Sequence, residues 1–424
     1  MLRRTVAPLF IGSLLLRLNS GANVIVLGLL LAQLSAHAGH PVTSLHVGLL
    51  PVVFYISELV LAPALGALSD RWGRRGFLIV GPLFGLLQVS LLVFTPTQNP
   101  LPYLLALQAL AGLSGAMTTP AILGYLADLT VENRAYRMRV MSFFELATSG
   151  GIALGTVMGG FAWERFGRGA FLLLAASYLL VSICMVLSPV VSQIIERSEA
   201  RVTLRRYWQL LRAPRLFVFI PAWICIMALV GVWLSSQLTF ILTRPVHDPH
   251  QFLMGLFSSP QAGRHISLVL GAFVCFFGLS LLFWAYALNR VPRLRLMLTS
   301  IGGVYLSCVV LFCINHFAVA GLWLLALFIP LLLLGIFAET GFAPAALAYL
   351  ADLSESVAKD RGLIMGLYSI FLGLGQILGN GLGGLFATRF GFDGLIYLTA
   401  ILACVALLSL LWLFSQEHEH VSAP

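Results

Sequence analysis

The stretch Pro120-Ala-Ile-Leu-Gly-Tyr-Leu-Ala-Asp-Leu129 occurs again, with two changes, as Pro344-Ala-Ala-Leu-Ala-Tyr-Leu-Ala-Asp-Leu353. Aligned without a gap at a displacement of 224 residues, the segments 120–167 and 344–391 are identical at 18 of 48 positions. Composition alone does not produce so many identities in one register. The repeat therefore predicts that the chain consists of two copies of one structural unit, both in the same orientation.

Long apolar runs surround this repeat. Of the 424 residues, 59% are hydrophobic and 10% are charged, and the mean hydropathy is +0.96. A water-soluble fold cannot bury that much apolar surface. Runs of about 20 apolar residues, long enough to cross ~30 Å of hydrocarbon, recur along the chain. We predict spans at 6–34, 45–68, 76–95, 101–126, 140–163, 168–192, 215–243, 265–288, 296–314, 319–350, 363–387 and 392–415.

These runs are continuously apolar rather than alternating, which favours membrane-spanning helices over barrel strands. The predicted fold class is an all-α membrane protein with twelve transmembrane helices in two parallel six-helix bundles. We expect an N-terminal bundle at 1–192, a basic cytoplasmic linker at 193–214 and a C-terminal bundle at 215–424. The linker has five arginines among apolar residues, which is typical of a helix on anionic lipid or of an ordinary cytoplasmic loop.

Basic residues are distributed unevenly between the two sides of the predicted membrane. With both termini placed inside, 19 Lys and Arg fall in cytoplasmic segments, 5 in external segments and one, Arg17, within a span. This bias predicts a multi-pass protein of the inner (plasma) membrane with both termini in the cytoplasm. The net charge of +9 is spread over short loops, so nucleic acid is not an expected partner.

Residues that could bind a metal or a cofactor are sparse. All six cysteines fall within predicted spans and show no metal or redox-motif spacing, which indicates packing roles. The segment His247-Asp-Pro-His250 offers two histidines in a proline-containing loop without further ligands, a weak metal site. We expect no metal and no cofactor.

A glycine pattern is also present in both copies. Glycines four residues apart lie on one face of a helix and allow a second helix to approach closely. The first copy has Gly151, Gly155, Gly159 and Gly160, and the second has Gly375, Gly379, Gly383 and Gly384. We predict tight helix packing at both faces.

Glycine and charge are concentrated in the turn Gly66-Ala-Leu-Ser-Asp-Arg-Trp-Gly-Arg-Arg75, between predicted spans 2 and 3. This turn resembles the signature loop of the major facilitator superfamily of membrane transporters. Carboxylates favour helix N-termini, and guanidinium groups form forked bonds with carboxylates. The resemblance implies that Asp70 faces the start of span 11, near Gly362 and Leu363, and that Arg74 pairs with Asp128.

Such contacts would latch the two halves together when the cytoplasmic side is closed. The predicted motif and gating residues are Gly66, Asp70, Arg71, Gly73, Arg74, Arg75, Asp128, Asp352 and Arg361. The corresponding turn of the second half, Leu288-Asn-Arg-Val-Pro-Arg-Leu-Arg295, lacks the aspartate and the glycines. We therefore expect one well-formed latch.

Spans 4 and 5 are similar to those of drug-extruding members of the superfamily such as the tetracycline exporters. Two residues depart from that pattern. Gln108 stands where the proton-driven antiporters carry arginine, and Thr156 replaces the proline of the span 5 signature. The resemblance favours export, but it transfers no proton-linked arginine to this chain.

Ionisable groups at membrane depth are costly and usually face a cavity or a partner. Arg17 and Glu58 could lie at similar depth and pair, whereas Glu339 has no basic residue in its own span. If transport is coupled to protons, Glu339 is the predicted proton carrier. The full set of predicted cavity residues is Arg17, Asn19, Asn23, Glu58, Gln108, Gln237, Glu339 and Asn380.

The predicted function is secondary active transport by alternating access, with export of a lipophilic or amphipathic small molecule, by a monomer that contacts membrane lipids. A lipid or lysolipid flippase and a solute uptake carrier of the same fold remain alternatives. Gly112-Leu-Ser-Gly115 also matches the nucleophile turn of rhomboid proteases, but no histidine is placed deep in a neighbouring span. A receptor or scaffold would leave the repeat and the latch motif unexplained.

Overall fold

The computed structural model describes residues 2–37, 42–129, 134–188, 214–245, 248, 250–259, 261–287, 291–317, 323–355 and 361–422. Nearly all of them are helical, and these described ranges contain no β-strand. In hydrocarbon a helix satisfies its backbone N–H and C=O groups within one segment, which explains why long apolar runs take this form. The predicted all-α class is confirmed.

The chain divides into two compact units. Unit 1 consists of Met1–Ser198, Ser236–Pro245 and Phe257–Cys275, and unit 2 of Glu199–Ser235, Val246–Leu256 and Phe276–Pro424. The predicted linker 193–214 lies outside the described residues except for Pro214. The division into bundles at 1–192 and 215–424 stays a prediction.

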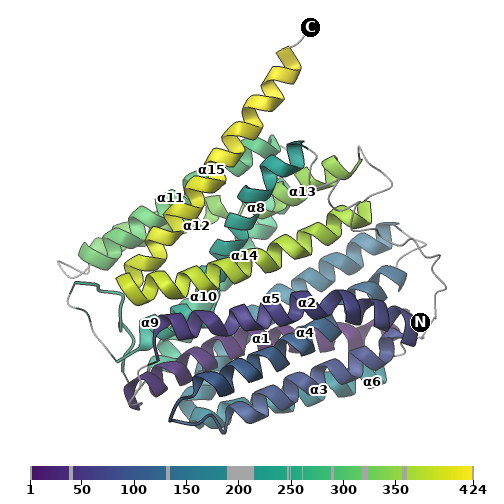
Figure 1. Cartoon of the computed structure of the whole chain (residues 1–424), viewed down its shortest axis with the longest axis vertical. Coiled ribbons are helices and arrows are strands. Elements are labelled where there is room, and N and C mark those ends of the chain that lie inside the picture. The colour runs from purple at the N-terminus through teal and green to yellow at the C-terminus, as the bar shows by residue number, and fades with distance from the viewer. Residues whose placement is uncertain are drawn as a thin grey trace. The chain divides into compact units, whose positions relative to one another are not determined.

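Within unit 1, α1 packs against α5, α6 and α9, while α4 packs against α2 and α3 (Figure 1). The elements of unit 1 are α1 (Leu2–His37), α2 (Ser44–Trp72), α3 (Arg74–Leu92), α4 (Leu101–Leu129), α5 (Arg134–Phe166), the 3-10 turn η1 (Gly167–Gly169), α6 (Ala170–Leu187), α9 (Ser236–Thr243) and the first part of α10 (Ala262–Ala287).

Unit 2 repeats this packing, because α8 packs against α14 and α15, and α11 packs against α12 and α15. The elements of unit 2 are the rest of α10, α8 (Pro214–Trp233), α11 (Arg293–Phe317), α12 (Trp323–Glu339), α13 (Phe342–Glu355), α14 (Arg361–Phe390) and α15 (Phe392–Ser422). The pairs α1–α5 and α8–α14 thus correspond, as the sequence repeat predicts.

Eleven stretches of the described residues are long and apolar enough to cross a membrane. One of them, Gly150–Leu187, contains the second half of α5 and all of α6, so it accounts for two of the predicted spans. Each predicted span coincides with described helix over most of its length. The chain is an integral membrane protein with many spans.

Two of the predicted spans are interrupted. Predicted span 7 consists of α8 and α9, which are separated at Leu234 and Ser235, and predicted span 10 consists of α12 and α13, which are separated at Thr340 and Gly341. Interrupted helices at membrane depth are tolerated where the freed backbone groups find other partners. The sequence pattern predicts both spans as continuous helices, and the structure corrects this.

The predicted glycine faces lie at close helix contacts. A side chain at Gly151 or Gly155 would collide with the backbone of α1 near Leu14 and Leu18, and one at Gly159 would collide with Ala22. Gly160 lies against Gly263 of α10 in unit 1. In unit 2, α14 uses Gly375 and Gly379 to approach α8 at Met227 and Ala228, and Gly383 and Gly384 are buried.

Candidate functional site

Two of the predicted intramembrane charges lie near each other in unit 1. Arg17 on α1 interacts electrostatically with Glu58 on α2, although these two described side chains form no direct ion pair. The Glu58 carboxylate lies against α4, where a Cβ at Gly115 would be 3.2 Å from Glu58 Oε1. Tyr55 and Tyr178 lie within electrostatic reach of Arg17. Unit 1 therefore holds a carboxylate, a guanidinium group and two phenols in one region.

Buried amide side chains form a second feature of unit 1. Asn19 on α1 and Gln237 on α9 are 0% and 1% exposed, and neither side chain has a hydrogen-bond partner within the described structure. Asn23 Oδ1 also lacks one, and Gln108 on α4 is buried. Because a buried amide without a partner is costly, such groups usually bind water or a ligand.

Unit 2 contains an amide pair that the sequence analysis identified only in part. Asn380 Nδ2 donates to the Gln376 carbonyl at 2.8 Å and contacts Gln376 Oε1 at 3.4 Å, one turn earlier on α14. The pair lies against Gly231 of α8, where a Cβ would be 2.9 Å from Asn380 Nδ2. Asn380 was predicted as a cavity residue and Gln376 was not, although Gln108 and Gln237, which are also isolated glutamines in apolar runs, were.

Glu339 is the last residue of α12, directly before the interruption of span 10. Its Oε2 accepts a hydrogen bond from Ser307 Oγ of α11 at 3.5 Å. A Cβ at Gly303 would be 2.7 Å from the Glu339 amide nitrogen, so α11 approaches this turn closely. Within the described part of unit 2, no Lys, Arg or His forms an ion pair with Glu339. The carboxyl group is thus hydrogen-bonded without an ion-pair partner among the described residues of its own unit.

The turn between α2 and α3 explains the glycine in its motif. Gly73 has φ +92°, a conformation that other residues rarely adopt. The Arg74 guanidinium group then lies over α4, since a Cβ at Gly124 would be 2.5 Å from Arg74 Cζ. Arg75 Nη2 donates to the Val186 carbonyl of α6 at 3.3 Å.

The predicted latch involves acidic side chains that lie outside the described residues. Arg74, the first residue of α3, lies over Gly124, which is one turn before Asp128 on α4. The side chains of Asp70, Asp128, Asp352 and Arg361 lie outside the described part of the chain, and so do those of Gly362 and Leu363. The latch remains a prediction.

The second half has a comparable contact although its turn lacks the motif. Arg293 at the start of α11 donates from Nη1 to the Ala348 carbonyl of α13 at 3.2 Å. Ala348 is the repeat counterpart of Gly124. An arginine therefore meets the same position of spans 4 and 10 in the two halves, which the comparison of the two turns did not predict.

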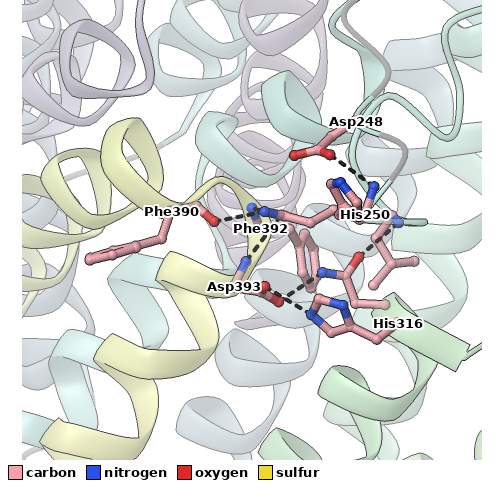
Figure 2. A network of polar contacts seen from close by, with 9 residues as sticks. Asp248, His250, His316, Phe390, Phe392 and Asp393 are labelled. Atoms are coloured by element: carbon pink, nitrogen blue, oxygen red, sulfur yellow. Dashed lines mark hydrogen bonds and ion pairs between the residues drawn. The ribbon is translucent and has the colours of Figure 1, made fainter.

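Gln251 attaches the segment after α9 to the turn between α14 and α15 (Figure 2). Its Oε1 accepts from the first backbone amide of α15, at Phe392, at 2.8 Å, and its Nε2 donates to the Phe390 carbonyl at 3.0 Å. Terminal N–H and C=O groups of helices need such partners. One side chain thus caps the end of α14 and the start of α15.

Asp393 extends this network to the end of α11. It accepts from Asn315 Nδ2 at 2.8 Å and contacts His316 Nε2 at 2.9 Å (Figure 2). Asn315 Oδ1 in turn accepts from the Leu253 amide at 2.9 Å. The connection is thereby fixed to the ends of three helices of unit 2. None of the residues in this network was predicted from the sequence.

Comparisons with known proteins agree with this architecture. The family model described as Major Facilitator Superfamily matches residues 9–263 and 251–424. Multidrug resistance protein 2 of Bacillus subtilis is 25% identical over 340 residues, which is 80% of this chain and 79% of that protein. The crystal structure of the nucleoside transporter NupG has a TM-score of 0.74 at 15% identity and covers 96% of this chain and 98% of that chain, a likeness of fold alone.

Shorter matches are more similar in sequence. Multidrug resistance protein 1 of Bacillus subtilis is 30% identical over 142 residues, which is 34% of this chain and 35% of that protein. The class C tetracycline resistance protein of Escherichia coli is 38% identical over 118 residues, 27% of this chain and 28% of that protein. The chain thus matches about a third of these two relatives' length. The predicted resemblance to drug and tetracycline exporters is confirmed, and the chain belongs to the Major Facilitator Superfamily, a family of membrane transporters rather than enzymes.

Proposed function

We propose that the protein exports a lipophilic or amphipathic small molecule across the inner membrane by alternating access, with both termini in the cytoplasm. The observation that carries this proposal is the match to a relative named for multidrug resistance over 80% of the chain. The match to a tetracycline resistance protein supports the same direction of transport. Residues 1–192 and 215–424 would be the two moving bundles of a monomer, joined by 193–214.

Growth and efflux measurements in a host that lacks its own drug pumps test this proposal. Expression of the protein should raise resistance to tetracycline or to the fluorescent cation ethidium, and cells loaded with ethidium should lose it faster. A protonophore should abolish the difference if the pump is proton-driven. Accumulation of either compound above the level of empty-vector cells would contradict export.

We further propose that Glu339 is the group that carries the proton. Glu339 is half-buried as a residue, and its carboxyl group accepts a bond from Ser307 and has no ion-pair partner among the described residues of unit 2. A carboxyl group in that setting can bind and release a proton without first breaking an ion pair. Glu58 differs, because Arg17 acts on it electrostatically.

Inside-out vesicles with an imposed pH gradient test this role. Glu339→Gln should abolish ethidium accumulation driven by the gradient while binding stays measurable. Glu164→Gln is a matched control, because Glu164 is an exposed carboxylate near the end of α5. Gradient-driven accumulation that is unchanged in Glu339→Gln would reject Glu339 as the carrier.

Uptake of a polar solute is the second candidate, since buried amides favour a ligand with hydrogen-bonding groups. Asn19, Gln237 and Asn380 Oδ1 have no hydrogen-bond partner in the described structure. The same vesicles, loaded with a radiolabelled nucleoside or sugar, distinguish the two candidates by the sign of the flux. Saturable transport of the polar solute, with no effect on ethidium, would favour uptake.

A further inference from the structure

The interruption of span 10 leaves the Phe337 carbonyl without its regular helical partner. In a continuous helix the Gly341 amide would bond to the Phe337 carbonyl, four residues earlier. Here the Gly341 amide bonds to the Ala338 carbonyl at 3.2 Å instead. The Phe337 carbonyl accepts from two side chains, Trp284 Nε1 at 2.6 Å and Thr340 Oγ1 at 2.8 Å.

Trp284 reaches this carbonyl from α10, in the part of that helix that belongs to unit 2. Its ring packs against the Phe337 ring with centroids 5.3 Å apart, and both rings contact Phe283 at 5.5 and 5.2 Å. The three rings hold the indole in place, so its N–H points at a fixed acceptor. The only other donor to that carbonyl in the described structure, Thr340, belongs to the interruption itself.

Glu339 lies two residues after this carbonyl, in the last turn of α12, so its position depends on what holds that turn. Its carboxylate faces α11, where Ser307 donates to it and the Cys308 thiol lies within electrostatic reach. Gly303 and Gly335 allow α11 and α12 to meet closely beside it. If the last turn of α12 lost its attachment to α10, that turn would shift and the carboxylate would leave Ser307.

We propose that Trp284 is a positioning residue: its indole N–H takes the place of the Gly341 amide at the Phe337 carbonyl, holds the last turn of α12 against α10 and thereby orients the Glu339 carboxyl group toward Ser307. This inference rests on the proposed role of Glu339 as proton carrier. When the indole N–H is removed, the last turn of α12 loses this attachment, and the Phe337 carbonyl turns to the Gly341 amide, because a carbonyl left unpaired in a low-dielectric setting is costly. Proton coupling then weakens, whereas substrate binding does not depend on this bond.

Three variants separate the hydrogen bond from the packing. Trp284→Phe removes the N–H and keeps an aromatic ring. Phe283→Leu removes a ring from the same cluster and keeps the N–H bond, so it is the matched control. Thr340→Val removes the second donor to the carbonyl with little change in shape, and it reports on the carbonyl even if Trp284→Phe fails to fold.

Two measurements on the full-length protein give the test. In vesicles, Trp284→Phe should reduce gradient-driven ethidium accumulation about tenfold, the loss expected from one buried hydrogen bond of ~1.4 kcal/mol, with ethidium exchange near the parental rate. Thr340→Val should do the same to a smaller degree. In infrared spectra, the carboxyl C=O band that disappears in Glu339→Gln should change frequency in Trp284→Phe and not in Phe283→Leu.

The two proposals fail in different ways. If Glu339→Gln keeps gradient-driven accumulation, the proton-carrier role is wrong, but the infrared band still reports whether Trp284 orients the carboxyl group. If Glu339→Gln loses coupling while Trp284→Phe matches the parent in both measurements, the positioning role is overturned. It is also overturned if Phe283→Leu produces the same losses and the same band shift as Trp284→Phe, because packing alone would then explain them.

Discussion

Spans 4 and 10 are copies of each other in sequence, yet one is a continuous helix and the other is not. α4 runs unbroken from Leu101 to Leu129, with Pro120 inside it. The copy is divided into α12 and α13, and its equivalent proline, Pro344, falls in the first turn of α13. Proline is tolerated there because the first amides of a helix have no internal partner. The difference shows that the proline alone does not interrupt the helix.

The residues before the proline differ between the copies. At the displacement of the repeat, Ala116 and Met117 of α4 correspond to Thr340 and Gly341. Glycine is about 1 kcal/mol less favourable than alanine within a helix, and Thr340 supplies a hydroxyl that competes for the Phe337 carbonyl. The local sequence thus weakens the helix, and Trp284 stabilises the interrupted form.

The same alignment pairs Gly115 with Glu339. Each half therefore has a carboxyl group at this position, but unit 1 supplies it from α2, where Glu58 lies against Gly115, whereas unit 2 supplies it from span 10 itself. Arg17 acts on the first carboxylate, and the second has no ion-pair partner among the described residues of its unit. The two halves thus hold a carboxyl group at equivalent positions, but in two different electrostatic settings.

The largest expected effect is the difference in gradient-driven transport between variants of the two carboxyl groups, Glu339 and Glu58. Glu339→Gln should reduce gradient-driven transport to the level measured without a gradient. Glu58→Gln should reduce it by no more than about fivefold, because an indirect charge interaction contributes only ~1 kcal/mol. Parallel vesicle assays at equal protein content check this order. Complete loss in Glu58→Gln together with full activity in Glu339→Gln would reverse the assignment.

The next effect concerns helix packing at another pair of equivalent positions, Gly112 and Ile336. Gly112→Ala would place a Cβ 2.5 Å from the Phe54 carbonyl oxygen and 2.6 Å from Ser57 Cβ, which should destabilise unit 1 by ~1–3 kcal/mol. The equivalent residue, Ile336, already has a large side chain, so the corresponding test there removes atoms instead of adding them. Ile336→Ala removes a side chain that is 6% exposed and should cost ~2–4 kcal/mol.

Thermal unfolding in detergent, followed by fluorescence, measures both variants. Gly278→Ala is a suitable control, because a Cβ at Gly278 would have no neighbour within 4 Å. If the Gly112→Ala variant were as stable as this control, α2 and α4 could move apart without a loss of unfolding free energy.

A smaller effect is expected from making span 10 resemble α4. Gly341→Ala should favour a continuous helix by ~1 kcal/mol, and a Cβ there would be 3.0 Å from Leu296 Cδ1, a side-chain atom that can move. Coupling should weaken by less than about tenfold, with stability unchanged or raised. When Gly341→Ala is combined with Trp284→Phe, the loss of coupling should exceed that of either change alone. A gain in gradient-driven accumulation in the double variant would contradict the proposed role of the interruption.

The smallest effect concerns the arginines that meet spans 4 and 10. Arg293 donates a hydrogen bond to the Ala348 carbonyl, a neutral acceptor that a lysine ammonium group can also reach, so Arg293→Lys should transport at nearly the parental rate. Arg74 lies over Gly124, and its predicted forked contact with Asp128 would not form with lysine. Arg74→Lys should therefore slow ethidium efflux, by a few-fold at most. Equal rates in the two variants would remove this difference between the halves.

Several residues of the site could be predicted, and others could not, for identifiable reasons. Arg17, Glu58 and Glu339 are conspicuous because charge is rare in apolar runs, and Gly73 is conspicuous through its motif. Ser307, Gln376 and Trp284 are ordinary in the sequence, and each gains its role from a partner on another helix or one turn away. Arg293 was discounted because its turn lacks the motif, yet it makes a contact equivalent to that of Arg74.

The amino-acid sequence by itself determined the class of this protein, its spans, its repeat and its family. Membrane hydrocarbon admits few backbone structures, so apolar length and periodicity are sufficient for that much. Tertiary structure alone decided where span 10 is interrupted, which helix presents a carboxyl group at the position of Gly115, and which donor holds the Phe337 carbonyl. Those outcomes depend on groups brought together from distant parts of the chain, and the free energy of such contacts has no counterpart in local sequence.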